Sequence, residues 1–393
     1  MTDKNSDAIV QHSSRIELSQ SAMRQNIKFV RNLIGSHPQI SVVVKANAYG
    51  HGFAEAVTMA EKCGIRHFAV ASSHEAQQII DVIGPESRIM IMGIMYEADL
   101  PWIIASEIEV YVFSFTRLKR IAEVAAQVDT RARIHLELET GGHRTGLDLD
   151  KLPEALKFIT AKRKHLELVG VCTHLAGAES IANNFRVSRQ LDEFNRVRRR
   201  LRKYKTLAPL FHIASSAATL TIPESRIDLV RIGTLTYGLW PSPDVHNLFL
   251  MQSSRRTNRS LKRVLSWKSD VMQVKKIRRN EFVGYGTSFQ APRDCEIAVI
   301  PVGYGNGYPR ELSNRGYVLI RGRRAPVVGS INMNMFFADV TNIPGVVVGD
   351  ETVLVGRQGK NEITLRSFSE FSSALNTEFV SRLPGTIPRK IVK

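Results

Sequence analysis

The chain has 393 residues, a length that suits about two or three domains, each able to bury a sizeable core. Apolar residues make up 43% of it and charged residues 23%, which is ordinary for a globular protein and excludes a largely disordered chain. Three widely separated cysteines, and the lack of an apolar stretch of signal-peptide or membrane-span length, favour a cytoplasmic protein without a membrane partner.

The formal net charge is +17, which invites a nucleic-acid hypothesis. The excess lies partly in two runs, "VRRRLRKYK" at 197–205 and "SSRRTNRSLKR" at 253–263. The first continues the polar side of an amphipathic helix, and the second resembles an exposed linker. Because neither has the interleaved aromatic residues of a single-strand binder, we expect solvated faces and no specific nucleic-acid partner.

Apolar residues recur at helical spacing from Glu17 to Leu33, which predicts a first helix. Short β-rich runs then alternate with amphipathic helical segments. The eight strand candidates are "SVVVKA" (from Ser41), "RHFAVAS" (Arg66), "RIMIMG" (Arg88), "IEVYVFS" (Ile108), "ARIHLEL" (Ala132), "LELVGVCTH" (Leu166), "LFHIAS" (Leu210) and "IDLVRIG" (Ile227). The helical segments include 53–63, 74–83, 116–128 and 181–201. This alternation predicts a (β/α)8 TIM-type barrel over residues 1–250.

An open doubly wound sheet is the alternative, but no G-x-G-x-x-G follows the first strand. After residue 250 the pattern changes to polar–apolar alternation between turn residues, which predicts a mainly antiparallel β domain over 251–393. The run "VVVGDETVLVG" at 346–356 predicts a hairpin that turns at Gly349 and Asp350. One short helix is expected near 368–375.

Polar residues gather where the predicted barrel strands end. Chemistry in such barrels takes place at the carboxyl ends of the strands. Those ends carry Lys45, Met92, Glu137, Arg144, His174, Ser215, Ser216, Arg231 and Gly233. Each alone has an ordinary structural interpretation, such as a solvated lysine, a core histidine or a structural ion pair. Their shared location favours a functional site.

Two further stretches predict an anion site. "ASSAATL" at 214–220 and "RIGTLTYG" at 231–238 place small residues where a strand turns into a helix. Backbone N–H groups there bind phosphate, and in barrels such sites recur after strands seven and eight. A phosphate site and a lysine on the first strand together suggest pyridoxal 5'-phosphate. We find neither metal-ligand spacing nor a Ser-His-Asp arrangement that competes.

Ordered motifs extend the argument to nearly the whole chain. They are "VVVKANAYGHG", "THLAGAE", "ASSAATL", "DLVRIGTLTYGL", "VGYGTSF", "PVGYGNGY" and "GSINMN". In these motifs the sequence resembles the alanine racemases from about Ser14 to Ile391. The resemblance implies a pyridoxal-phosphate barrel followed by a β domain, and a homodimer with shared active sites.

The resemblance also implies roles for individual residues. Lys45 would hold the cofactor and act as one catalytic base, and Tyr285 would be the other base, contributed by the partner subunit. The remaining cofactor-binding set is Tyr49, Met92, Arg144, His174, Ser215, Ser216, Arg231, Gly233 and Thr234. The substrate-binding set is Arg144, Met333, Tyr304 and Glu137, with Arg310 and Glu179 in the channel that admits substrate.

This chain departs from the family pattern at three positions. Glu137 replaces a carbamylated lysine and is expected to brace Arg144. Gly142 replaces a methionine, and Gly385 lies at or near the place of a pocket tyrosine. Because both glycines remove bulk, serine or a broader set of amino acids is the alternative to alanine. A pyridoxal-phosphate aldolase or decarboxylase, and a cofactor carrier without turnover, are other classes that we weigh; "VGYGTSF" and the β domain argue against them.

Overall fold

The chain folds into two compact units. The structure is a computed structural model that describes residues 11–202, 207, 209–252, 261–369 and 376–393. The barrel unit comprises Ser21–Ala48 and Ala56–Arg263, and the β unit comprises Tyr49–Glu55, Val264–Lys393 and the chain up to Gln20. The boundary that we predicted at 250/251 falls inside a helix, and the basic runs lie partly outside the described residues, at 203–205 and 253–260.

The barrel unit contains eight parallel strands. They are β2 (Gln39–Val43), β3 (His67–Ser72), β4 (Arg88–Ile94), β5 (Glu109–Val112), β6 (Ala132–Glu137), β7 (Leu166–Cys172), β8 (Leu210–His212) and β9 (Leu229–Ile232). Their order is β8-β7-β6-β5-β4-β3-β2-β9. Backbone hydrogen bonds from Asp228 to Phe211 (3.1 Å) and from Arg231 to Ala214 (2.9 Å) join the two ends. The predicted (β/α)8 barrel is confirmed.

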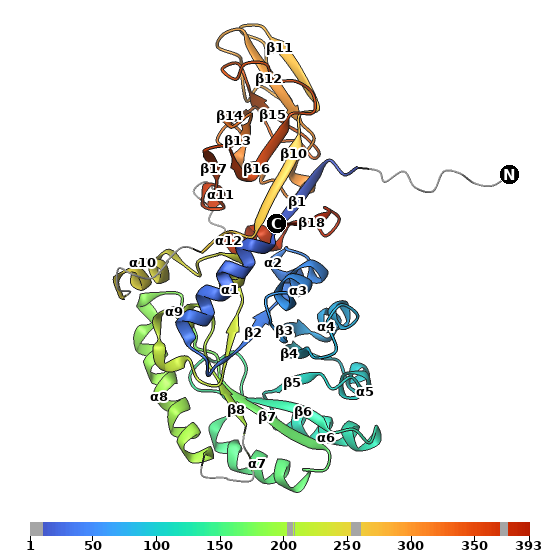
Figure 1. Ribbon diagram of the computed structural model, residues 1–393, viewed down its shortest axis with the longest axis vertical. Helices are drawn as coiled ribbons and strands as arrows, with labels where there is room; N and C mark the ends of the chain where they lie inside the picture. The colour runs from blue at the N-terminus through green and yellow to red at the C-terminus, as the bar shows by residue number, and fades with distance from the viewer. Residues whose placement is uncertain (1–10, 203–206, 208, 253–260, 370–375) are drawn as a thin grey trace, which may run out of the picture. The chain divides into compact units, whose positions relative to one another are not determined.

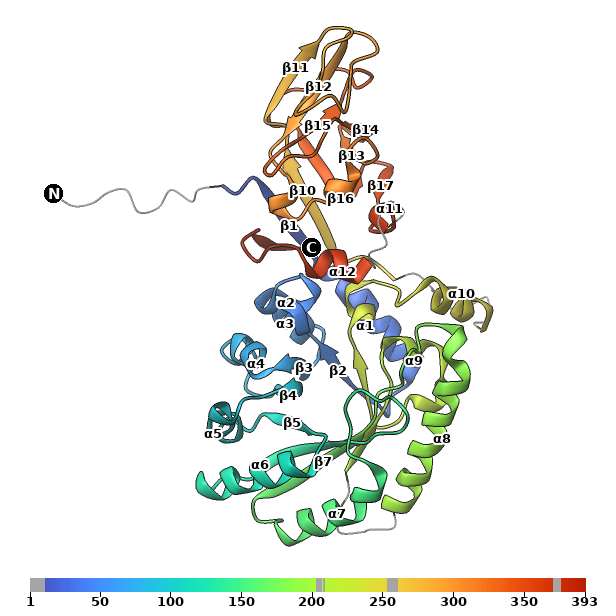
Figure 2. The ribbon, with the colours of Figure 1, turned by 180° about the vertical axis from the view of Figure 1, so that it is seen from behind.

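Helices lie outside this ring of strands, as Figures 1 and 2 show from opposite sides. They are α1 (Gln20–Ile34), α3 (Phe53–Glu61), α4 (Ser73–Ile80), α5 (Leu100–Ala105), α6 (Phe115–Gln127), α7 (Leu152–Ala161), α8 (Asn184–Leu201), α9 (Ser216–Thr221) and α10 (Pro243–Gln252). The α6 helix shows why these segments fold locally: Ser114 caps its first turn by accepting from the Arg117 amide, and its apolar face is buried. None of the described helices is long and apolar enough to cross a membrane.

The first predicted helix begins later than expected. Ser14–Ser19 forms strand β1 of the β unit, and the helix starts at Gln20. Within β1 the side chains alternate between buried and partly exposed, and Ile16 and Leu18 are fully buried. The correction has a physical reason. "SRIELS" fits a period of two as well as a helical period, and pairing with β10 (Leu265–Asp270), about 250 residues away, decides between them.

The β unit is built on a mainly antiparallel sheet, as predicted. Its order is β11-β12-β15-β14-β13-β16-β10-β1-β18, with β17 beside β16. The other strands are β11 (Gln273–Ile277), β12 (Cys295–Ile300), β13 (Tyr317–Ile320), β14 (Arg323–Val328), β15 (Phe336–Asp339), β16 (Glu351–Gln358), β17 (Asn361–Ile363) and β18 (Arg389–Val392). The β1 and β18 pair is parallel, so two strands far apart in the sequence lie side by side in one sheet.

One local prediction in this unit is wrong, and another falls mostly outside the described residues. The hairpin at Gly349 and Asp350 is wrong, because Val347 and Val348 are exposed and form no strand; the hairpin joins β16 to β17 instead. The Asp350 carboxylate accepts from the Val347 amide and fixes that segment as a turn. Of the helix expected at 368–375, the structure describes α11 (Arg366–Ser369) and then α12 (Asn376–Ser381), while 370–375 lie outside the described residues.

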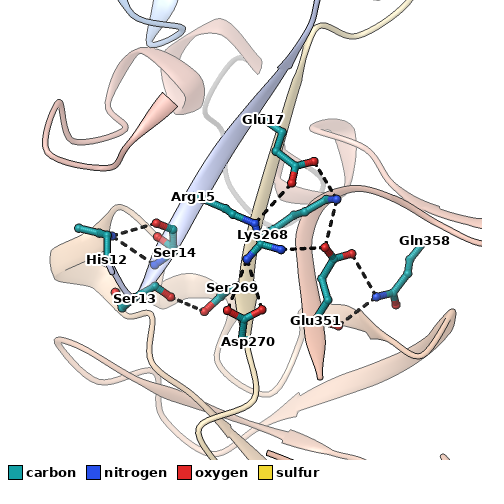
Figure 3. Close-up of polar contacts among 10 residues, drawn as sticks. All are labelled: His12, Ser13, Ser14, Arg15, Glu17, Lys268, Ser269, Asp270, Glu351 and Gln358. Carbon is teal, nitrogen blue, oxygen red and sulfur yellow. Dashed lines mark hydrogen bonds and ion pairs between the residues drawn. The ribbon is translucent and has the colours of Figure 1, made fainter. Parts of the chain in front are cut away.

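Strand β1 is held on both of its faces. On the polar face Arg15 pairs with Asp270 and Glu351, and Lys268 pairs with Glu17 and Glu351 (Figure 3). On the apolar face Ile16 lies opposite Trp267, which is fully buried. Because the ion pairs are partly exposed, we assign most of the stabilisation to the apolar face.

The substitution Ile16→Ala should lower the free energy of unfolding of the β unit by about 2–5 kcal/mol, because it leaves a cavity in a packed core. Hydrogen exchange of β1 and β10 amides measures the loss. Arg15→Ala, on the other face of the same strand, is the matched control and should cost no more than about 1 kcal/mol. Equal losses in the two variants would contradict this assignment.

Candidate active site

Lys45 lies where β2 ends and the chain makes an unusual turn. Residues 46–48 of α2 (Lys45–Tyr49) have φ and ψ between 48° and 54°, which is the left-handed helical conformation. For residues other than glycine this costs roughly 1–2 kcal/mol each. The Ala48 amide nevertheless closes the turn by donating to Val44 O (2.6 Å). Strain of this kind is found where function requires a particular backbone path, here the path that follows Lys45.

A carboxylate that the sequence analysis did not single out holds this turn. The two oxygens of Glu75 accept from the amides of Ala46 and Ala71, each at 2.7 Å. One side chain therefore ties the turn after Lys45 to the end of β3. The sequence signal was weak: an acidic residue in the first turn of a predicted helix, a position that usually only favours the helix dipole.

Four predicted site residues of the barrel unit, namely Lys45, Arg144, His174 and Arg231, interact electrostatically. Lys45 reaches solvent, yet burial by the surrounding protein and the charge of Arg144 lower the pKa of its ammonium, while Glu75 opposes the shift. Burial, reinforced by Arg231, Arg144 and Lys45, lowers the pKa of His174 to about 3, so this histidine is neutral. The positive field therefore comes from the lysine and the two arginines.

Arg231 is the buried member of this set. It stands on β9 and donates to carbonyl oxygens of Thr173 (2.9 Å) and His212 (2.9 Å). It also contacts His212 Nδ1 at 2.6 Å. No direct carboxylate partner of Arg231 occurs within the described residues. The described contacts include no hydrogen bond between Arg231 and His174.

The residues of the predicted phosphate site lie together after β8 and β9. Ser215 caps α9 by accepting from the Ala218 amide, and the Ser216 hydroxyl accepts from the Gly233 amide at 3.0 Å. Beside them the Thr234 hydroxyl oxygen is buried and has no hydrogen-bond partner among the described residues. A buried hydroxyl left unsatisfied costs free energy, so a polar group bound here would remove that cost.

The loop that carries Arg144 is fixed by two residues that we did not predict. The Glu139 carboxylate accepts from the amides of Gly141 (2.5 Å), Gly142 (2.6 Å) and His143 (2.8 Å). From the other side Arg186 donates to the carbonyls of Gly141 and Gly142. Arg144 and His174 line the adjoining cavity of about 230 Å³. The signal was "ETGG", an acidic residue ahead of two glycines whose amides can approach it closely.

Glu137 does not brace Arg144 in this structure. It lines the same cavity and is buried, but its carboxylate forms no hydrogen bond or ion pair within the described residues. Burial lowers the pKa of Arg117 to about 10, and the Glu137 charge opposes that shift. The negative charge of Glu137 thus acts toward α6, while Glu139 fixes the loop of Arg144.

The remaining predicted residues are distributed over both units. In the barrel unit, Met92 is a partly buried residue of β4, and Glu179 is exposed on a loop. Tyr49 ends α2 and belongs to the β unit. The described residues contain no group of three or more metal-ligating side chains.

In the β unit, three predicted substrate residues lie together. The Gly305 amide donates to Met333 O at 2.8 Å, and the Arg310 guanidinium lies 5.9 Å from the Tyr304 ring centre. Tyr285 is 77% exposed and stands between two glycines with positive φ, Gly284 and Gly286. A Cβ on Gly284 would lie 2.8 Å from the Phe337 ring, so this loop needs a glycine to present Tyr285.

Comparison with known proteins shows the family of both units. The family description "Alanine racemase, N-terminal domain" matches residues 18–241, and "Alanine racemase, C-terminal domain" matches residues 264–391. The chain belongs to the alanine racemase family. The matches cover both units, so the family resemblance inferred from the motifs is confirmed.

Individual relatives in this family match over almost their whole length. The alanine racemase of Methanococcus maripaludis is 32% identical over 385 residues, which cover 97% of this chain and 99% of that protein. Among solved structures, the alanine racemase of Streptomyces lavendulae has a TM-score of 0.87 and 28% identity, and covers 98% of both chains. The Bacillus anthracis alanine racemase, solved with bound L-Ala-P, has a TM-score of 0.86 and 25% identity, covering 98% of this chain and 96% of that one.

The substitution Glu139→Gln should raise the hydrogen-exchange rate of the Gly141–His143 amides by roughly ten-fold or more, because three charge-assisted hydrogen bonds are weakened. Glu137→Gln is the matched control, two residues away on the same strand end, and should leave that rate unchanged. If Glu137→Gln loosens the loop as much as Glu139→Gln does, Glu137 has the bracing role after all.

Proposed function

We propose that this protein is a racemase that interconverts L- and D-alanine with pyridoxal 5'-phosphate as cofactor. The observation that carries the proposal is the cluster of Lys45, Arg144 and Arg231 at the carboxyl ends of the barrel strands. None of these three cations forms an ion pair within the part of the chain that the structure describes. Such a concentration of positive charge suits a dianionic phosphate cofactor and an amino-acid carboxylate.

The residues of the barrel unit fit this cofactor. Lys45 supplies an amine whose lowered pKa favours the neutral, nucleophilic form that attaches to the aldehyde. Ser216, Gly233 and the unsatisfied Thr234 hydroxyl would hold the phosphate, with Ser215 and Tyr49 completing that set. When bound, the cofactor supplies an electron sink that acidifies the Cα–H bond of the attached amino acid.

Two residues would set the electronic state of the cofactor ring. His174 is neutral, so it can pack against the ring without adding charge. Arg231 would face the pyridine nitrogen; since a guanidinium keeps its protons, that nitrogen would stay unprotonated. An unprotonated ring withdraws electrons less strongly, which favours return of a proton to Cα over transamination. Met92, at the end of β4, would complete the ring site.

The substrate carboxylate would bind to Arg144, whose loop Glu139 and Arg186 hold in place. The Met333 backbone would complete that site, with Tyr304, Arg310 and Glu179 in the channel that admits substrate. Glu137 would add a fixed negative charge to the wall of the same cavity.

Racemisation needs, on each face of Cα, a group that can remove or return a proton. Lys45 Nζ would hold the proton on one face, and the phenol oxygen of Tyr285 of the partner subunit would hold it on the other. A phenol oxygen acts as a base where positive charge favours phenolate, and Lys45, Arg144 and Arg231 supply that charge. The exposed position of Tyr285 on its unit suits a residue that completes the site of another copy, so the functional unit is a homodimer.

The pocket departures bear on which amino acid is used. A Cβ on Gly142 would have its nearest neighbour, Gln190 Nε2, at 3.5 Å, and a Cβ on Gly385 would meet nothing within 4 Å. Both positions therefore have room for more bulk. The family match nevertheless favours alanine over the serine or broad-specificity alternative.

We also propose that the protein is cytoplasmic, since its three cysteines are all buried and form no disulfide.

Chiral chromatography across a panel of L-amino acids should show conversion of L-alanine to the D enantiomer faster than conversion of any other amino acid. Lys45→Ala and Tyr285→Phe should each lower kcat by about 10²–10⁴-fold, because each removes a proton-transfer group. Tyr96→Phe changes another exposed tyrosine and should leave kcat unaltered. Full activity in Tyr285→Phe, or in a purified monomer, would rule out the two-base dimer.

The substitution Arg231→Glu should increase pyruvate formation by transamination relative to racemisation, because a carboxylate beside the pyridine nitrogen favours its protonation. Arg231→Lys preserves the positive charge and is the control. The two products are measured in one reaction, pyruvate by a coupled assay and D-alanine by chromatography. An unchanged ratio in Arg231→Glu would refute the assigned role.

A further inference from the structure

A continuous chain of buried polar side chains crosses the interior of the barrel unit and ends at Arg231. Its contacts are Ser41 Oγ to His67 Nδ1 (2.8 Å), His67 Nε2 to Glu109 Oε2 (2.9 Å), Glu109 Oε2 to His135 Nε2 (2.9 Å), His135 Nδ1 to His212 Nε2 (2.9 Å) and His212 Nδ1 to Arg231 Nη1 (2.6 Å). All six side chains are buried. We call this set the interior relay.

The two ends of the relay fix the direction of its hydrogen bonds. Arginine has only donors, so Nδ1 of His212 must accept from Arg231. The proton of His212 is therefore on Nε2, which donates to Nδ1 of His135. His135 in turn carries its proton on Nε2 and donates to the Glu109 carboxylate. A neutral imidazole has one donor and one acceptor, so this is the one consistent arrangement of the segment from Arg231 to Glu109.

The same logic excludes an extra proton. If His135 carried two protons, both nitrogens of His212 would have to accept, and His212 would have no position for its own proton. Burial lowers the pKa of both histidines, in agreement with neutral rings. Burial alone would raise the pKa of Glu109, but hydrogen bonds from His135 and His67 outweigh it and hold that pKa well below its usual range. Glu109 is thus the anion at the far end.

The barrel makes room for this arrangement and balances its charge. A Cβ on Gly170 of β7 would lie 2.1 Å from His135 Nδ1 and 3.1 Å from His212 Nε2, so the histidine pair requires a glycine there. The second oxygen of Glu109 accepts from Arg133 Nη2 at 3.1 Å and pairs with Arg88 Nη1 at 3.5 Å, and Arg133 also pairs with Glu167. Glu167 touches Arg133 but none of the relay histidines within the described contacts.

We propose that Glu109 is a positioning residue, which orients Arg231 through the neutral imidazoles of His135 and His212. A glutamine amide at position 109 can present an N–H to His135, which favours the opposite direction of the relay against the direction that Arg231 sets. A reversed relay would place an N–H of His212 against an N–H of Arg231 and would displace the guanidinium. The effect on catalysis rests on the proposed function of Arg231, whereas the direction of the relay does not.

The direct test is ¹⁵N NMR of the histidine rings in the holoenzyme, labelled with ¹⁵N-histidine and assigned with His67→Gln and His135→Gln variants. The expected result is that His135 and His212 carry protons on Nε2 and none on Nδ1 between about pH 6 and 9. A proton on Nδ1 of either ring, or titration of either ring in that range, would overturn the proposal. This arm needs no substitution at Glu109.

The second arm compares Glu109→Gln with Glu167→Gln, which removes the other carboxylate partner of Arg133 and leaves the relay intact. Glu109→Gln should put protons on Nδ1 of His135 and raise transamination relative to racemisation by roughly five-fold. Glu167→Gln should change neither. Equal effects of the two variants would show that Glu109 acts through its arginine partners and not through the histidines, and would overturn the proposal. If the unmodified protein racemises no amino acid, the proposed function is wrong. The direction of the relay is then tested by the tautomers of His135 and His212 alone.

Discussion

A guanidinium buried inside a parallel barrel is costly unless its donors are satisfied and its charge is balanced, and Arg231 is such a group. Its donors are met by backbone carbonyls and by one imidazole nitrogen, all of them neutral. The nearest anion along the hydrogen bonds is Glu109, two imidazoles away. Much of the polar interior of the barrel unit follows from this one constraint: neutral histidines, a glycine on β7 that admits them, and an anion at the far end.

The same constraint shapes the mouth of the barrel. Arg231, Arg144 and Lys45 have no anionic side chain paired with them in the described parts of the chain, so a bound anion is the natural way to complete their electrostatics. The backbone turn after Lys45 is strained, and hydrogen bonds to the Glu75 carboxylate stabilise it. The position of this lysine therefore costs conformational free energy. An enzyme that uses a covalently held phosphate cofactor needs a precisely placed lysine and an unpaired cationic site. The lysine amine must be neutral enough to react, and the phosphate must be held near it.

The sequence was most informative where chemistry and local pattern coincide. Buried β-branched runs such as "SVVVKA" predicted all eight barrel strands, and "VVVKANAYGHG" made Lys45 the candidate for holding the cofactor. It was least informative where a distant partner decides the structure. β1 looked helical because its partner in β10 lies about 250 residues away. Glu109 looked like one charged residue in an apolar strand because its partners come from β3, β4 and β6. Glu137 and Glu139 share one strand end, and only side-chain geometry shows which of them holds the loop of Arg144.

The central claim is that Lys45 stands in the barrel mouth to hold a phosphate cofactor. Borohydride reduction of the purified protein, followed by peptide mass spectrometry, tests it most directly because reduction makes the covalent link permanent. The account predicts a phosphopyridoxyl adduct on the peptide that contains Lys45, and loss of that adduct when the chain carries Lys45→Ala. An unmodified Lys45 in protein supplied with pyridoxal 5'-phosphate, or an adduct on a different lysine, would contradict it.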